Sequence, residues 1–229
     1  MKRNSLRGVY KTSPRVSTSL ARLDRAFYAA SSPEVARRTL GKLLVRIVDG
    51  RRLSGVVVET EAYRGPRDPA SHAYRGKTKR NEVMFGEPGH AYVYFTYGNH
   101  FCLNLTCEPA GAPAAVLVRA IEPQEGIETM KENSGKQRVL DLANGPGKLT
   151  KALQIRGDLN GADLVTSERL FLEPGGTPPR VATSSRVGIT DGTGRRWRYF
   201  VSGNPFVSPG RPSNRPPRTH NYHRRPRTE

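Results

Sequence analysis

The chain has 229 residues, enough to bury the core of one large domain or of two small ones. No apolar run approaches the length of a membrane span, and two cysteines, Cys102 and Cys107, with no CxxC pattern, argue against a disulfide framework and a cysteine-based zinc site. The net charge of +18 favours a polyanionic partner, with a solvated basic surface as the alternative. The mean hydropathy of −0.62 is low for a compact domain, so we expect part of the chain not to be packed.

The basic residues are concentrated at the two ends. Residues 1–22 hold six Lys or Arg and no acid, and residues 210–229 hold six Arg and four Pro, so the ends supply +11 of the net charge. Such compositions bury too little apolar surface to fold, and we expect a disordered basic arm at 1–22 and a disordered Pro/Arg-rich tail at 209–229. An organelle transit peptide is the alternative for the first segment. Between them we expect one domain, residues 23–208.

The central segment alternates short strand-like runs with turn signals. Ser32-Pro33-Glu34 predicts a helix that is capped by Ser32 and ends at Gly41, and hairpin turns are expected at Asp49-Gly50 and Gly98-Asn99. Residues 64–90 are rich in Gly, Pro, Arg and Asn, which predicts long loops with a short helix. Strands are predicted at 42–48, 53–62, 92–97, 100–106, 114–121, 169–173, 181–189 and 197–201, with further helices at 124–132 and 149–155. Hairpins joining neighbouring strands predict a mixed α/β (α+β) fold with a mostly antiparallel sheet.

The strand-like run from Val56 to Tyr63 carries two carboxylates. Side chains alternate along a strand, so Glu59, Glu61 and Tyr63 share one face. Placing carboxylates at the end of an apolar strand costs desolvation energy unless something uses them, and such a group can act as a general base on water. Ordinary surface or ion-pair roles for both glutamates are the alternative interpretation.

The second predicted hairpin is rich in aromatic residues, most of which are typical of a core. Tyr97 differs because it lies beside the Gly98-Asn99 turn, at a tip that ought to be exposed. An exposed aromatic residue at the tip of a hairpin on a basic protein indicates a wedge between bases or a stacking platform.

Two further segments fit nucleic-acid binding or catalysis without requiring it. His72 lies in the predicted loop, followed by basic residues from Arg75 to Arg80 that could track phosphates or form a solvated loop. Asn144 to Lys148 precedes a predicted helix and could bring backbone N–H groups and Lys148 to a phosphate, or could simply begin the helix. It lacks the spacing of a triphosphate-binding loop.

Taken together, these residues resemble the alkyladenine (3-methyladenine) DNA glycosylase family. The resemblance covers roughly residues 23–208, omits both basic ends, and depends on the combination of motifs rather than on any one of them. In chain order the matching pieces are Glu59-Thr60-Glu61-Ala62-Tyr63, Gly65-Pro66, His72, Arg80-Asn81, Met84-Phe85, Tyr92-Val93-Tyr94, Tyr97-Gly98, Phe101-Cys102, Asn104, Leu117-Val118-Arg119-Ala120, Glu122-Pro123, Gly145-Pro146, Lys148-Leu149 and Arg186-Val187-Gly188.

The resemblance implies a base-excision-repair enzyme that flips alkylated or deaminated purines (3-methyladenine, 7-methylguanine, hypoxanthine) out of double-stranded DNA and hydrolyses the N-glycosidic bond. Glu61 would bind and deprotonate the attacking water, and Arg119 and the backbone carbonyl of Val187 would help to hold it. The matched motifs offer no lysine nucleophile, so the expected product is an abasic site in an uncut strand. No metal or cofactor is expected.

The resemblance also implies how DNA is held. Tyr63 and His72 on one side and Tyr94 on the other would sandwich the purine, and Asn104 would exclude the amino group of guanine. The remaining implied contacts are with the duplex: Tyr97 would fill the gap left by the flipped nucleotide, and Arg80 and Lys148 would contact phosphates.

The role of Asn104 conflicts with a regular hairpin. A strict two-residue turn at Gly98-Asn99 pairs Tyr94 with Leu103 and turns Asn104 to the opposite face. Asn104 then needs a bulge, or a place beyond the paired region, to reach the same pocket as Tyr94.

The fold that the resemblance implies is a single domain with a curved sheet, flanking helices and a protruding β-hairpin, similar to the C-terminal domain of methionyl-tRNA formyltransferases. We expect a monomer, in the cytoplasm with the nucleoid of a bacterium or in a eukaryotic nucleus. A nonenzymatic nucleic-acid-binding module and a lesion sensor without hydrolysis are the alternatives. The strand-rich chain argues against a helix-hairpin-helix glycosylase.

Overall fold

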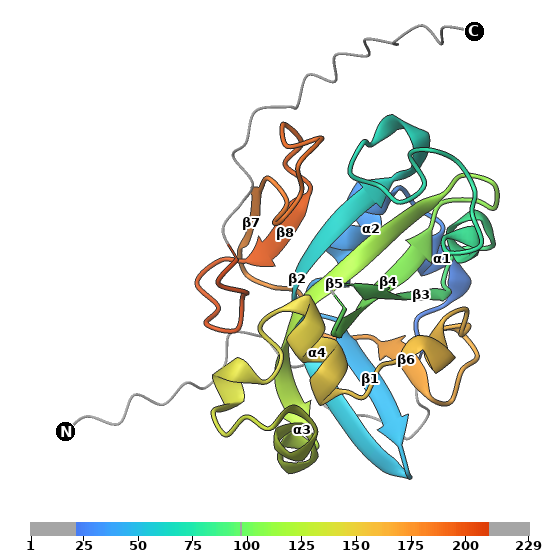
Figure 1. Ribbon diagram of the computed structural model, residues 1–229. Helices are drawn as coiled ribbons and strands as arrows, with labels where there is room; N and C mark the ends of the chain where they lie inside the picture. Colours follow the sequence, from blue (N-terminus) through green and yellow to red (C-terminus); the bar gives the residue numbers. More distant parts are fainter. Residues whose placement is uncertain (1–21, 97, 211–229) are drawn as a thin grey trace, which may run out of the picture.

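The computed structural model describes residues 22–96 and 98–210 (Figure 1). The strands are β1 (Leu43–Val48), β2 (Arg51–Arg64), β3 (Ala91–Thr96), β4 (His100–Cys107), β5 (Ala114–Glu125), β6 (Leu170–Glu173), β7 (Val181–Ser184) and β8 (Arg198–Val201). The α-helices are α1 (Arg25–Tyr28), α2 (Ser32–Thr39), α3 (Ile127–Ser134) and α4 (Pro146–Ala152). Short 3-10 helices lie at Gly65–Arg67, Glu82–Phe85, Val139–Asp141 and Gly157–Leu159.

All of these strands join one curled sheet in which every neighbouring pair is antiparallel. The order is β3-β4-β5-β2-β1-β6, and β8 pairs with both β2 and β7. Strand β2 is the centre, since β5 follows one of its edges while β1 pairs with the other edge up to Val56 and β8 takes over from Glu59 (Figure 1). The predicted mixed α/β domain with a curved antiparallel sheet is confirmed.

The turn between β1 and β2 is the one that its sequence predicts. Val48 pairs directly with Arg51, which leaves Asp49 and Gly50 as a two-residue loop. Both loop residues have positive φ angles, 49° and 73°, as a type I′ turn requires.

The β3–β4 hairpin differs from its predicted register. Thr96 pairs with His100, so three residues, and not two, separate the strands. Tyr94 therefore pairs with Cys102, and Tyr92 pairs with Asn104. This register places all four side chains on one face of the sheet, which removes the conflict over Asn104.

Other predicted ends are wrong by a few residues. Helix α2 begins at Ser32 with Ser31 as its cap residue, and β7 stops at Ser184. Strand β5 continues to Glu125 because it pairs with β2, so α3 begins only at Ile127. Tertiary pairing here outweighs the local helix propensity of Gln124 and Glu125.

Alternation gives the sheet two distinct faces. On one face apolar residues pack with the helices into the main core; they include Val57, Ala62, Leu103, Leu105, Val116 and Val118. On the other face Tyr92 and Ala115 meet Met84 and Ala73, which come from the long segment after β2. That segment thus covers part of the second face and forms one rim of a cavity there.

Residues 1–21 and 211–229 lie outside the described residues, so the predicted basic arm and tail, with the predicted domain limits, stay predictions. Among the described residues, no helix has the length and apolarity of a membrane span, and no group of three or more His, Cys, Asp or Glu could hold a metal ion.

Candidate active site

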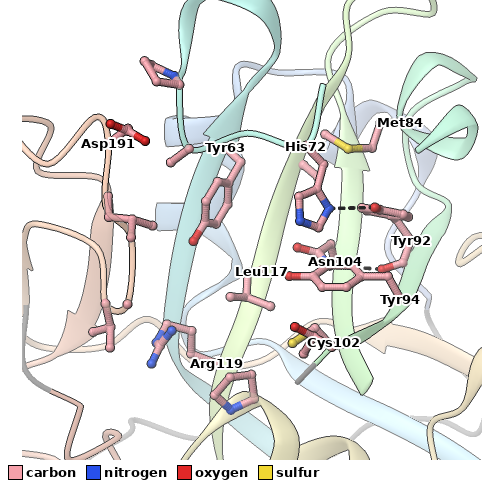
Figure 2. Close-up of a pocket in the computed structure, with 18 of the residues that line it drawn as sticks. Tyr63, His72, Met84, Tyr92, Tyr94, Cys102, Asn104, Leu117, Arg119 and Asp191 are labelled. Carbon is pink, nitrogen blue, oxygen red and sulfur yellow. Dashed lines mark hydrogen bonds between the residues drawn. The ribbon is translucent and has the colours of Figure 1, made fainter. Parts of the chain in front are cut away.

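A cavity of about 330 Å³ opens on the second face of the sheet (Figure 2). Its floor contains Tyr92, Asn104 and Leu117, which are paired directly across β3, β4 and β5, and Leu117 is paired in turn with Glu61 on β2. Strand alternation brings Tyr94, Cys102, Arg119 and Tyr63 to the same face. The site is therefore assembled by the register of β2 to β5, with one or more side chains from each strand.

The Glu61 carboxylate is fully buried beside this cavity. Its Oε1 accepts a hydrogen bond of 2.7 Å from the backbone N–H of Val187, and its Oε2 accepts one of 2.8 Å from the hydroxyl of Tyr63. Arg119 Nη1 lies 3.4 Å from Oε2. Tyr63, Arg119 and Val187 all line the cavity, so the structure brings together the residues predicted to surround the attacking water. The contact of Val187 with Glu61 runs through its N–H, whereas the resemblance implied a role for its carbonyl.

Arg119 is shared between two buried carboxylates. Its Nε donates to Glu59 Oε1 at 2.8 Å, in addition to the Nη1 contact with Glu61. Burial by itself would lower the pKa of Arg119, but Glu61 and Glu59 outweigh that effect and raise it, so the guanidinium stays charged.

Glu59 is the centre of contacts that the sequence did not predict. Its Oε1 also accepts from Arg198 Nε at 2.7 Å and from Ser208 Oγ at 2.9 Å, and its Oε2 accepts from the Ser208 N–H at 2.7 Å. Burial would raise the pKa of Glu59, but Arg119 and Arg198 outweigh burial and hold that pKa below its usual value. The face shared by Glu59 and Glu61 was predicted correctly, but nothing local in the sequence marks Ser208 as a partner.

Aromatic side chains form opposite walls of the cavity. Figure 2 shows Tyr63 across the cavity from His72 and Tyr94. The ring centroids of His72 and Tyr94 are 4.5 Å apart, and His72 Nδ1 lies 2.8 Å from the Tyr92 hydroxyl oxygen. The placement of His72 beside Tyr63 is therefore wrong, because the hydrogen bond to Tyr92 holds the imidazole on the β3 side.

His72 is an uncharged wall of this cavity at neutral pH. Burial, and then the nearby Arg80 guanidinium, lower its pKa from the ordinary value of 6.5. A neutral imidazole does not repel a cationic ligand, so an electron-poor, positively charged ring could stack here.

Asn104 lies in the floor of the cavity, as the resemblance requires. Its side chain is only 4% exposed, and its Nδ2 donates to the Tyr92 carbonyl at 3.1 Å, which fixes the orientation of the amide. The structure thus supports its place in the pocket, while its role in excluding guanine stays a prediction.

A buried ion pair between Arg186 and Asp68 packs against the ring of Tyr63. Arg186 donates to both carboxylate oxygens of Asp68, and its guanidinium lies 4.6 Å from the centre of the Tyr63 ring. Arg186 Nη1 also donates to the Ala62 carbonyl at 2.9 Å. The sequence placed Arg186 within a matching motif but gave no reason to pair it with Asp68, which lies in a segment predicted only as a loop.

Of the residues expected to contact DNA, Arg80 and Lys148 are not among the residues that line the cavity, and Tyr97 lies outside the described part of the chain. Arg80 has its guanidinium 5.2 Å from the Tyr94 ring and donates to the Phe95 carbonyl at 3.3 Å. Lys148 donates to Asn144 Oδ1 at 2.8 Å. Tyr97 is outside the described residues, and Phe95, two residues before it on the same hairpin, is 50% exposed.

Comparisons with known proteins identify a matching family model and close relatives. The family model described as "Methylpurine-DNA glycosylase (MPG)" matches residues 26–205. A protein of Chlorobium phaeobacteroides strain BS1 is 47% identical over 192 residues, which cover 82% of this chain and 96% of that protein. A protein of Chlorobium phaeobacteroides strain DSM 266 is 50% identical over 190 residues with the same coverage, and one of Burkholderia lata is 47% identical over 190 residues, covering 81% and 90%. All three are named "Putative 3-methyladenine DNA glycosylase". The chain therefore belongs to the methylpurine-DNA glycosylase family.

Proposed function

We propose that this DNA glycosylase excises alkylated and deaminated purines, 3-methyladenine, 7-methylguanine and hypoxanthine, from double-stranded DNA by hydrolysis. Its membership of the family makes it a hydrolase of DNA repair. The substrates, the water-activating role of Glu61 and the uncut product strand are our proposal. Action as a monomer without a metal belongs to the same proposal.

Base flipping is the first step. The C1′ atom of the target nucleotide is inaccessible inside the duplex, so the nucleotide leaves the stack at a cost of about a few kcal/mol, least for a weakly paired, damaged base. The cavity of about 330 Å³ lies within the range of small-molecule pockets. In this proposal Tyr97 fills the vacated place in the duplex, and Arg80 and Lys148 contact the flanking phosphates.

Selection follows from the walls of the cavity. An alkylated purine is cationic, and each favourable contact with an aromatic face contributes about 0.5–2 kcal/mol. Tyr63 and Tyr94 supply these faces, and the neutral His72 adds no opposing charge. Asn104 at the floor crowds the exocyclic amino group of undamaged guanine.

Hydrolysis follows from the environment of Glu61. A water held by Glu61, Arg119 and the carbonyl of Val187 attacks C1′ and gives its proton to the Glu61 carboxylate, while the glycosidic electron pair leaves with the base. The Glu61 charge also stabilises the oxocarbenium-like transition state, as carboxylates do in glycoside hydrolysis. A cationic purine leaves readily, whereas hypoxanthine needs its leaving nitrogen protonated or strongly hydrogen-bonded. Among the described residues that line the cavity there is no lysine, which supports hydrolysis without strand cleavage.

The observation that carries the proposal is the fully buried Glu61 carboxylate bounded by three residues that line the cavity. The test measures base release from a duplex with one hypoxanthine and from methylated genomic DNA, with Glu61→Gln as the matched isosteric control. We expect release by the wild type only, and strand breakage only after alkali. Equal release by both proteins would overturn the role of Glu61. DNA binding without release from either substrate would point to a binding module.

A further inference from the structure

Four charged side chains are buried together behind the proposed catalytic centre. Glu59 and Glu61 are fully buried, and Arg119 and Arg198 are nearly so. Two negative and two positive charges balance, but the contacts are not symmetric. Glu59 contacts both guanidiniums at 2.7–2.8 Å, whereas Glu61 contacts only Arg119, at 3.4 Å.

We propose that Glu59 is a positioning residue that acts through Arg119. By holding the Arg119 guanidinium, it prevents a close two-point ion pair between Arg119 and Glu61 and so leaves Glu61 able to take the proton of water. This inference rests on the proposed function of Glu61.

The orientation of Arg119 supports this role. A guanidinium is a rigid planar fork, so fixing one nitrogen fixes the plane of all three. The short bond from Nε to Glu59 leaves Nη1 at a long 3.4 Å from Glu61, and Nη2 donates to Ser208 Oγ, also at 3.4 Å. An unanchored guanidinium would prefer the two parallel hydrogen bonds of an arginine–carboxylate pair. A carboxylate bound in that way is a poorer proton acceptor.

The anchor is itself firmly held. Glu59 accepts from Arg198 and from both the N–H and the hydroxyl of Ser208, so three chain segments meet at its carboxylate. The two guanidiniums keep the pKa of Glu59 low, and it therefore carries a charge at neutral pH. This constant negative charge takes up the attraction of Arg119 that would otherwise fall on Glu61.

The segment after β8 closes the cluster. Ser208 lies against Glu59 and Arg119, and a Cβ at Gly210 would lie 2.8 Å from Val187 Cγ1 and 3.4 Å from Arg119 Nη2. This segment therefore belongs to the support of the catalytic centre. The other titratable groups that face the cluster come from β2, β4 and the segment before Val187: Tyr63, Cys102 and Arg186.

The experiment compares three full-length variants with the wild type. Glu59→Gln removes the charge and keeps the shape. Ser208→Ala removes the hydroxyl that contacts both Glu59 and Arg119 and carries less risk for folding. Glu122→Gln is the matched control, since Glu122 holds the same C-terminal segment by accepting from Asn204 at 2.8 Å. Single-turnover release of hypoxanthine is measured with the enzyme in excess, and binding is measured with a duplex that carries an uncleavable abasic-site analogue.

We expect Glu59→Gln to lower the single-turnover rate about 10- to 100-fold, less than the full contribution of a general base. The loss should fall on the rate and not on binding, because Arg119 then pairs closely with the Glu61 oxygens that would otherwise accept from water. Ser208→Ala should lose about 3- to 10-fold. Binding, and the rate of Glu122→Gln, should stay within about threefold of wild type.

Two results would overturn the inference while leaving the proposed function intact. One is a Glu59→Gln rate near that of wild type in a protein whose Glu61→Gln variant is inactive. The other is a loss of rate with an equal loss of binding, or an equal loss of rate in Glu122→Gln, since either marks a merely structural role. If Glu59→Gln does not fold, Ser208→Ala decides: an unchanged rate refutes the inference.

Discussion

Replacing Asp68 by Asn would leave the Arg186 guanidinium buried without its counter-ion. Both side chains are fully buried, and the two hydrogen bonds between them measure 2.5 and 2.7 Å. Removing one partner of a buried ion pair costs about 3–5 kcal/mol. Arg186 keeps its bond to the Ala62 carbonyl and its contact with the Tyr63 ring, so we expect the lower end, about 3 kcal/mol. A domain of ordinary stability, about 5–15 kcal/mol, would still fold.

Urea unfolding gives this free energy directly, from the shift of the midpoint at constant slope. The single tryptophan, Trp197, has its ring 5.5 Å from the Arg186 guanidinium and reports the site, while far-UV circular dichroism reports the whole sheet. The double variant Asp68→Leu/Arg186→Met removes both charges and should recover most of the loss. A single-variant loss below about 1 kcal/mol, or a double variant as unstable as the single one, would refute an uncompensated charge as the cause.

Three other predictions concern the pocket wall, its floor and a distant turn. The pKa of His72 is lowered in the folded protein, so its contribution to stability is present above about pH 6.5 and is lost as pH falls. In urea unfolding, the free energy of unfolding should therefore drop more between about pH 7.5 and pH 5.5 for the wild type than for His72→Gln. Asn104→Ala should release undamaged guanine about tenfold faster than wild type, measured on normal duplex DNA, and an unchanged rate would exclude Asn104 as the discriminating group. Gly126 has φ +71°, and a Cβ there would lie 2.3 Å from Leu53 Cδ2. Gly126→Ala should therefore lower the free energy of unfolding by about 1–3 kcal/mol with the rate of the folded enzyme unchanged, and a loss of rate alone would contradict this.

Local patterns predicted well the strand that carries Glu59 and Glu61. Alternation placed Glu59, Glu61 and Tyr63 on one face, and their contacts through Arg119 and the Tyr63 hydroxyl bear this out. The Asp49-Gly50 turn was equally clear, because few residue pairs adopt two positive φ angles in succession. In both cases the information lies within a few residues of chain.

What the sequence could not supply depends on contacts between distant segments. Asp68 and Arg186 lie 118 residues apart, and Glu59 and Ser208 lie 149 apart, so no local pattern pairs them. The side of the cavity that His72 occupies follows from a hydrogen bond to Tyr92 on another strand. The Asn104 register failed for a different reason: the glycine at the turn signalled a hairpin but not the number of residues in its loop.

The attachment of β7 and β8 has a consequence for the heat resistance of catalysis. Strand β8 joins the sheet through three residue pairs with β2, β7 pairs only with β8 among the described strands, and the loop between them carries Arg186 and Val187. Local openings need less free energy than global unfolding, because only part of the contacts must break. Detaching this hairpin would take the Val187 N–H from Glu61, Arg198 from Glu59 and Arg186 from Asp68 together, while the remaining strands stayed paired. Base release should therefore stop several degrees below the temperature at which the sheet unfolds. It should return on cooling without any refolding of the core.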